Sequence, residues 1–64
     1  MTYKITLKAA RVNAGLTQAE AAEKLGKIKQ TIGSWESGKT KPRSTELAAL
    51  CDLYAVPIDL ILLQ

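Results

Sequence analysis

The 64-residue chain is predicted to fold as one all-α domain, a compact bundle of five helices spanning residues 1–64, on three observations. A capping box formed by Thr17 and Glu20 marks the start of one helix. Gly15, Gly26 and Gly38 stand where helices should end, because glycine readily adopts the positive φ of a helix C-terminus. Between these signals apolar residues recur at intervals of three and four, which is the helical period.

The first helix is expected between about Thr6 and Ala14. The Thr6 hydroxyl can cap its start by accepting a hydrogen bond from a free backbone N–H of the first turn. Leu7, Ala10 and Ala14 recur at the spacing of one helix face and are expected to point inward. Gly15 should end this helix.

Residues 17–38 are the most informative stretch, because they predict two short helices joined by a tight turn. The first begins at Gln18, after the capping box, and ends before Gly26. The second is expected from about Lys29 to Ser37. With only residues 26 to 28 to connect them, the helices cannot lie antiparallel and must cross steeply, which is the helix-turn-helix arrangement.

A further helix is expected directly after Arg43 or Ser44, which follow a loop that contains a proline. Its apolar residues follow the spacing of one helix face, and they are Leu47, Leu50, Cys51 and Tyr54. Pro57 breaks this helix and suits the first turn of a short fifth helix that ends near Leu63.

The expected fifth helix would leave apolar side chains on the surface. If Ile58, Ile61 and Leu62 face inward, three leucines must point outward. These leucines are Leu53, Leu60 and Leu63. An exposed apolar patch on so small a domain is typical of a contact surface, so the sequence predicts a homodimer through it. The alternative is a fraying tail with scattered surface leucines.

The composition excludes several kinds of chemistry. The chain has no histidine and one cysteine, so an intrachain disulfide, a zinc site and catalysis by a Cys/His or Ser/His pair are excluded. We expect no enzyme activity, no cofactor, no metal site and no small-molecule ligand. The longest apolar run, residues 60–63, is far shorter than the roughly 20 residues of a membrane span, and the N-terminus lacks the apolar core of a signal peptide. We therefore expect a cytoplasmic protein that binds no membrane.

The formal net charge is only +3, but the charges are unevenly distributed. Residues 24–43 hold six basic side chains and one acidic side chain, whereas residues 44–64 hold three acidic side chains and no basic one. A basic cluster is commonly just a solvated surface. This one coincides with the second helix of the predicted helix-turn-helix and the loop after it, which favours a surface that neutralises phosphates.

A series of short motifs runs along the chain: Gly15-Leu16-Thr17-Gln18, Leu25-Gly26, Thr31-Ile32, Trp35-Glu36, Gly38-Lys39 and Pro42. At this spacing they resemble the DNA-binding domain of the phage repressor and Cro group, the Xre-type helix-turn-helix proteins. The resemblance covers nearly the whole chain from Leu7 onward and implies a lambda-repressor-like fold that binds DNA. Two features depart from it. Lys27 and Ile28 replace an apolar residue and a Ser or Thr cap, and Gly33 lies inside the recognition helix.

The exposed N-terminal face of that helix is expected to read bases, because an α-helix fits the major groove, where each base pair shows a distinct donor and acceptor pattern. Gln30 can pair with adenine N6 and N7, and Lys29 can donate to guanine O6 and N7. Ser34 and Thr31 complete this set, although Thr31 also fits a buried position. Ile28 could contact a thymine methyl group, but the interpretation we favour for it is core packing.

Other residues are expected to bind phosphates, which fixes the register of the protein on DNA. By resemblance, Gln18 holds the DNA backbone at a helix N-terminus, where free N–H groups attract an anion. The remaining phosphate candidates are basic residues of the same region: Lys27, Lys39, Lys41 and Arg43. The resemblance also implies a partly buried structural ion pair between Arg11 and Glu36. Trp35 and Cys51 are expected in the core.

These observations lead to one hypothesis and two alternatives. The hypothesis is a sequence-specific, double-stranded DNA-binding transcriptional regulator in a bacterial cell, a phage or prophage repressor of Cro-like size that acts as a dimer on a pseudo-palindromic operator. The first alternative is the DNA-binding antitoxin of a toxin and antitoxin pair. The second is a helix-turn-helix fold used purely for contact with another protein.

Overall fold

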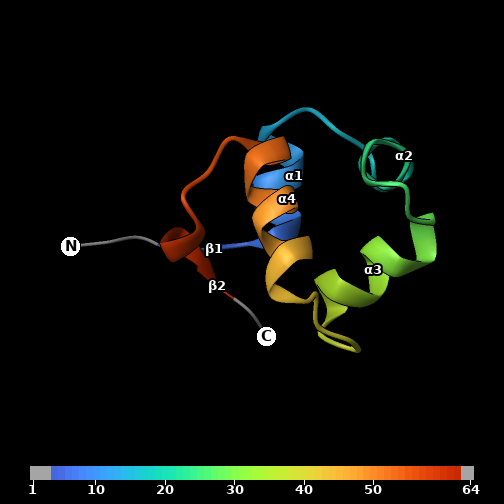
Figure 1. The fold of residues 1–64 in the computed structure, drawn as a ribbon. Coiled ribbons are helices and arrows are strands. Elements are labelled where there is room, and N and C mark those ends of the chain that lie inside the picture. The colour runs from blue at the N-terminus through green and yellow to red at the C-terminus, as the bar shows by residue number, and fades with distance from the viewer. Residues whose placement is uncertain (1–3, 63–64) are drawn as a thin grey trace.

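A computed structural model describes residues 4–62 of the chain, and four α-helices dominate this part. The helices are α1 (Leu7–Asn13), α2 (Gln18–Leu25), α3 (Lys29–Ser37) and α4 (Ser44–Tyr54). A 3-10 helix, η1 (Ile58–Leu60), and two short strands, β1 (Ile5–Thr6) and β2 (Ile61–Leu62), complete the described elements. In Figure 1, α1 and α4 occupy the middle, with α2 and α3 on one side and η1 with the strands on the other.

The ends of the first three helices follow the local signals in the sequence. Thr6 Oγ1 accepts a hydrogen bond from the Ala9 N–H at 3.1 Å and caps α1. At the start of α2 the capping box is complete: Thr17 Oγ1 accepts from the Glu20 N–H at 3.1 Å, and the Thr17 N–H donates to Glu20 Oε1 at 2.9 Å. This backbone hydrogen bond lowers the pKa of the Glu20 carboxyl group. Gly26 and Gly38 end α2 and α3 with φ of 67° and 81°, so these boundaries are confirmed.

The helices α2 and α3 cross at a steep angle, as the short connection requires. In Figure 1, α2 is viewed nearly along its axis, while α3 lies across the field of view. The turn is closed by the Lys27 N–H, which donates to the Ala22 carbonyl oxygen at 2.8 Å. This geometry confirms the predicted helix-turn-helix arrangement.

One hydrophobic core fills the space between the four helices. Its buried apolar residues are Leu7, Ala10, Ala21, Ala22, Ile32, Trp35, Leu50, Cys51, Tyr54 and Ile61. Trp35 and Cys51 are core residues as predicted, and burial raises the pKa of the Cys51 thiol. The hydroxyl group of Tyr54 is buried without a hydrogen-bond partner among residues 4–62, and burial raises its pKa to about 12.

The predicted fifth α-helix is wrong. After Pro57 the chain makes only the 3-10 turn of η1 and then becomes extended as β2, which pairs in parallel with β1. Ile61 lies opposite Ile5 in this pair. Because side chains alternate along a strand, Ile61 is buried while Leu62 is 46% exposed. The strand pair also orders Ile5, which packs against the core.

The burial expected for several side chains near the chain ends is also wrong. Ile58 was expected inward but is 52% exposed, because it lies on a 3-10 turn rather than on the face of an α-helix. Leu53 and Leu60 were expected outward but are half-buried, and Leu53 packs against the core. Leu63 lies outside the described residues. Ala14 was expected inward but is exposed at the end of α1, where Arg11 is the buried residue of the last turn.

Residues 4–62 lack two structural features. No helix in this part of the chain combines the length and the apolar character needed to cross a membrane. No group of three or more histidine, cysteine, aspartate or glutamate side chains lies close enough together there to hold a metal ion.

Candidate nucleic-acid interface

The helix α3 has one buried and one accessible face. Ile32 and Trp35 anchor it in the core. Lys29 and Gln30, at its start, are exposed to solvent. Because helical side chains three or four positions apart share a face, the accessible side of the first two turns includes the predicted base-reading residues. Of these, Thr31 and Ser34 are half-buried, whereas Lys29 and Gln30 are exposed.

Ile28 lies at the N-cap of α3 and is far from buried. Its carbonyl oxygen accepts hydrogen bonds from the N–H groups of Thr31 at 3.0 Å and Ile32 at 3.5 Å, which places it at the helix start. Its side chain makes no capping hydrogen bond and is 63% exposed. Core packing, the interpretation favoured from sequence, is therefore wrong. An isoleucine in sequence carries no signal that distinguishes a buried position from this exposed one.

A hydrogen-bonded network joins α1, α2 and α3 at the base of the helix-turn-helix. Arg11 Nε and Glu36 Oε2 form an ion pair at 2.6 Å, and the two side chains are 10% and 6% exposed. Arg11 also donates to the Leu16 carbonyl oxygen at 2.8 Å. The hydrogen bond to Glu36 raises the pKa of Arg11 and outweighs the opposing effect of burial. The guanidinium group is thus held charged in a shielded site.

Gln18 belongs to the same network. Its Nε2 donates a hydrogen bond to Glu36 Oε1 at 3.0 Å, so the first turn of α2 is tied to the last turns of α3. A primary amide carries two N–H groups, so this contact leaves Gln18 a second donor. In the free protein Gln18 therefore has a structural partner, and its predicted phosphate contact would use the other N–H.

Gly33 lies directly beside the Gln18 amide. A Cβ atom added at Gly33 would meet both Gln18 Nε2 and Oε1 at 3.7 Å, an ordinary van der Waals distance. The absent side chain contributes to a shallow hollow of about 270 Å³. The residues that line it are Lys8, Gln18, Gly33, Glu36 and Ser37. Gly33 thus leaves the Gln18 side chain more open than a larger residue would.

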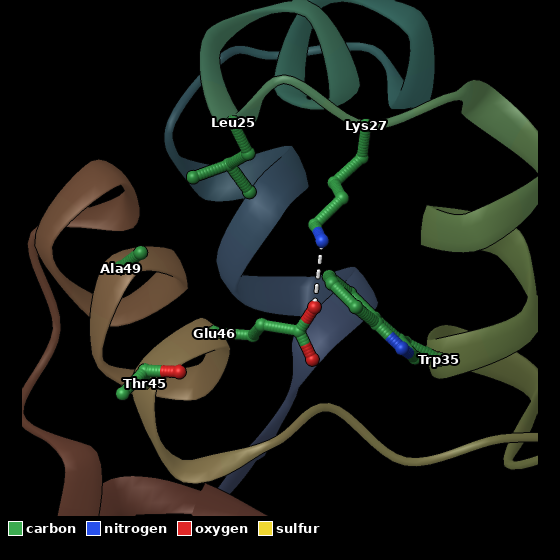
Figure 2. A pocket seen from close by; sticks show the side chains of 6 residues that line it. All are labelled: Leu25, Lys27, Trp35, Thr45, Glu46 and Ala49. Carbon is green, nitrogen blue, oxygen red and sulfur yellow. Dashed lines mark ion pairs between the residues drawn. The ribbon is translucent and has the colours of Figure 1, made fainter.

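Lys27 faces α4 rather than standing free. Its Nζ atom lies 2.7 Å from Glu46 Oε2, and Figure 2 shows this ion pair beside the Trp35 ring. Glu46 Oε1 accepts a second hydrogen bond from the Arg43 N–H at 2.8 Å. These two contacts lower the pKa of the Glu46 carboxyl group, and the contact from Lys27 has the larger effect. Of the predicted phosphate-binding cations, Lys27 is therefore the one with an acidic partner in the described structure.

The Lys27–Glu46 pair also borders a cleft of about 140 Å³ where the helix-turn-helix meets α4 (Figure 2). Its lining residues are Leu25, Lys27, Trp35, Thr45, Glu46 and Ala49. The ion pair closes one side of an otherwise mainly apolar surface.

The other predicted phosphate-binding cations lie on the loop that follows α3. Lys39, Lys41 and Arg43 are all exposed. The loop starts directly at the end of α3, because the Lys39 N–H donates to the Ser34 carbonyl oxygen at 3.0 Å. We call residues 39–43 the basic loop. It follows α3 directly in the chain, so the cationic candidates come just after the helix that carries the base-reading candidates.

Two short helices that cross steeply, with the N-terminal residues of the second exposed, define the helix-turn-helix class of DNA-binding domains. Comparison with known families agrees: the helix-turn-helix family profile matches residues 7–61. The chain therefore belongs to the helix-turn-helix family, in its Xre and Cro-like branch.

Two curated proteins illustrate the range of relatives. The HTH-type transcriptional activator BcrR of Enterococcus faecalis is 34% identical over 62 residues, which is 97% of this chain and 30% of that protein. The type II methyltransferase M.SsoII of Shigella sonnei is 42% identical over 55 residues, which is 81% of this chain and 14% of that protein. The chain thus spans less than a third of the length of either relative. No solved structure gives a significant match.

Proposed function

We propose that this chain is a sequence-specific, double-stranded DNA-binding domain that regulates transcription. The observation that carries the proposal is the exposure of Lys29 and Gln30 at the start of α3, together with an exposed basic loop that follows the C-terminal end of the same helix. An α-helix presented in this way fits the major groove, and the adjacent cations neutralise the phosphates on either side. Membership of the helix-turn-helix family and the similarity to a named transcriptional activator support it.

In this proposal the exposed residues divide into two roles. Lys29 and Gln30 read base edges, with Ser34 and Thr31 completing the contact further along the helix. The phosphate-binding group consists of Gln18, Lys39, Lys41 and Arg43. Lys27 joins it only if its ammonium group exchanges Glu46 for a phosphate, because the two acceptors compete for the same charge.

We further propose that the domain acts as a dimer on a pseudo-palindromic operator, as a repressor of Cro-like size. The support is the apolar C-terminal segment, in which Ile58 and Leu62 are exposed and Leu60 is half-buried. A two-fold dimer would place two recognition helices on successive faces of the major groove. Leu60→Glu should then give monomers in sedimentation experiments, while Val12→Glu on exposed α1 should not. An unchanged association state in Leu60→Glu would place the interface elsewhere.

Activation is a second candidate for the direction of regulation. The relative from Enterococcus faecalis is named a transcriptional activator, and the same DNA contacts serve either outcome. A reporter with the operator placed over, or upstream of, a promoter separates the two. Repression requires loss of expression at the overlapping site, whereas activation requires a gain at the upstream site.

Selection of bound duplexes from a random library tests the proposal, with the selected duplex then titrated at increasing salt. We expect a defined motif and an affinity that falls roughly linearly with the logarithm of salt concentration, because several phosphates are neutralised. Enrichment of no motif, together with binding that is insensitive to salt between about 50 and 200 mM, would favour a domain used for protein contact.

A further inference from the structure

We propose that Ile28 reads a thymine by packing against its C5 methyl group in the major groove. This inference rests on the proposed function and deepens it, since it adds an apolar base contact to the polar contacts of α3. The base it selects is identified by chemistry: the thymine methyl group is the apolar group that the major-groove edges of the four standard bases present.

Ile28 adjoins the start of α3 in the chain. Ile28 is the residue directly before Lys29 and Gln30, and all three are exposed. Its backbone is extended, with φ of −101° and ψ of 157°, and its carbonyl oxygen is bonded into the first turn of α3. A helix that enters the groove by its N-terminal residues would therefore carry the Ile28 side chain in with it.

The Ile28 side chain is open to solvent. At 63%, Ile28 is the most exposed large apolar side chain in the described part of the chain. Scattered surface apolar residues are ordinary, so exposure alone decides nothing. The next most exposed are Val12 on α1 and Ile58 on η1, and η1 lies on the opposite side of α1 and α4 from α3 (Figure 1). Ile28 directly precedes Lys29 and Gln30, so it is the one of these three that adjoins the proposed base-reading residues in the chain.

Ile28 is a β-branched residue at an N-cap position where its side chain makes no capping hydrogen bond. A serine or threonine at the N-cap would satisfy a free N–H of the first turn, but the Ile28 side chain has no polar atom and makes no capping hydrogen bond. The position therefore gives up a stabilising hydrogen bond. A β-branched side chain has restricted χ1 freedom, so Ile28 presents a fixed apolar surface. A surface of this kind can pack against a single thymine methyl group at one base position.

The test uses the duplex selected from the random library, in which each thymine is replaced in turn by deoxyuridine, which lacks only the C5 methyl group. We expect one thymine in each half-site to give a loss of about fourfold in affinity, the amount that corresponds to one buried methyl-sized group. Replacement of that thymine by 5-bromodeoxyuridine, whose bromine occupies the place of the methyl, should restore most of the affinity.

Two variants make the test specific to Ile28. Ile28→Ala should bind the thymine and deoxyuridine duplexes equally, whereas Val12→Ala, which shortens an exposed side chain on another helix, should keep the wild-type difference. Circular dichroism confirms that both are folded. Salt-dependent binding with no methyl-sensitive position, or an Ile28→Ala variant that keeps the deoxyuridine penalty, would overturn this inference and leave the proposed function standing. Failure to bind any duplex would overturn the proposed function itself.

Discussion

Gln18 donates a hydrogen bond from Nε2 to Glu36 Oε1 at 3.0 Å, while Arg11 forms an ion pair with the other oxygen of the same carboxylate. One acidic side chain therefore fixes three helices: the end of α1, the start of α2 and the last turns of α3. It also orients the amide that we propose for phosphate binding. In this proposal the Glu36 carboxylate serves both stability and phosphate binding.

Removal of that carboxylate should be costly. In Glu36→Ala the Arg11 guanidinium group would remain largely buried without its counter-charge, and breaking a buried pair from one side costs about 3 to 5 kcal/mol. This loss approaches the whole stability expected of a small domain. Urea unfolding measures it. Glu23→Ala, on the exposed side of α2, is the control and should change the unfolding free energy by less than about 0.5 kcal/mol. Equal effects in the two variants would show that the ion pair contributes nothing specific.

Gly33→Ala should stabilise the protein. Gly33 lies inside α3 with ordinary helical backbone, and a Cβ atom there meets Gln18 at an unstrained 3.7 Å. Alanine is favoured over glycine inside a helix by about 0.5 to 1 kcal/mol, so the midpoint of thermal unfolding should rise. Gly26→Ala is the matched control. Its φ of 67° is left-handed, so the same substitution there should lower the midpoint, and a loss of stability in both would contradict the packing described for Gly33.

Acid should weaken the link between the helix-turn-helix and α4. The contacts from Lys27 and the Arg43 backbone lower the pKa of Glu46 from its ordinary value of 4.5. The unfolded state then binds the proton more readily, so this contribution is present above pH 4.5 and is lost as the pH falls through the lower folded pKa. Unfolding followed between pH 6 and about pH 3 should show a smaller acid loss in Glu46→Gln than in wild type. Glu23→Gln serves as the control and should retain the wild-type acid loss.

Base reading and phosphate binding should separate by mutation. Gln30→Ala is expected to relax preference at one or two positions of the selected motif, whereas Lys39→Ala should weaken all duplexes about equally and reduce the salt dependence by about one phosphate contact. Competition binding against a panel of single-base variants measures both effects. Equal loss across the whole panel for Gln30→Ala would remove Gln30 from the base-reading set.

The sequence predicts the elements whose signals are local. Thr17 and Glu20 lie three residues apart and define the start of α2 by themselves, and Gly26 ends it because of its own backbone freedom. The strand pair was not predictable in this way. Ile61 lies in a strand that pairs with β1, and its partner in the register, Ile5, lies near the other end of the chain. The apolar spacing of residues 58–62 fits a helix equally well.

In the candidate site, too, features that depend on neighbouring residues could be predicted from the sequence, whereas contacts between distant residues could not. The candidate base-reading positions depend on where α3 starts, and the sequence places that start only at about Lys29, because Ile28 offers no capping side chain. The hydrogen-bond and ion-pair partners of the polar side chains cannot be predicted from the sequence in this way. Lys27 reads as one more cation in a basic run, and only the fold shows Glu46 beside it. For Ile28 the sequence favours core packing, because apolarity usually indicates burial, whereas in the fold Ile28 lies exposed at the N-cap of α3.

The central claim is that the first turns of α3 and the basic loop form the surface that contacts a duplex. Amide chemical shifts of the ¹⁵N-labelled chain, recorded as the selected duplex is added, test this residue by residue. We predict that the changes concentrate at residues 17–18, 27–34 and 37–43, with little change along η1 and β2. Changes concentrated at η1 and β2, with α3 unaffected, would contradict the account.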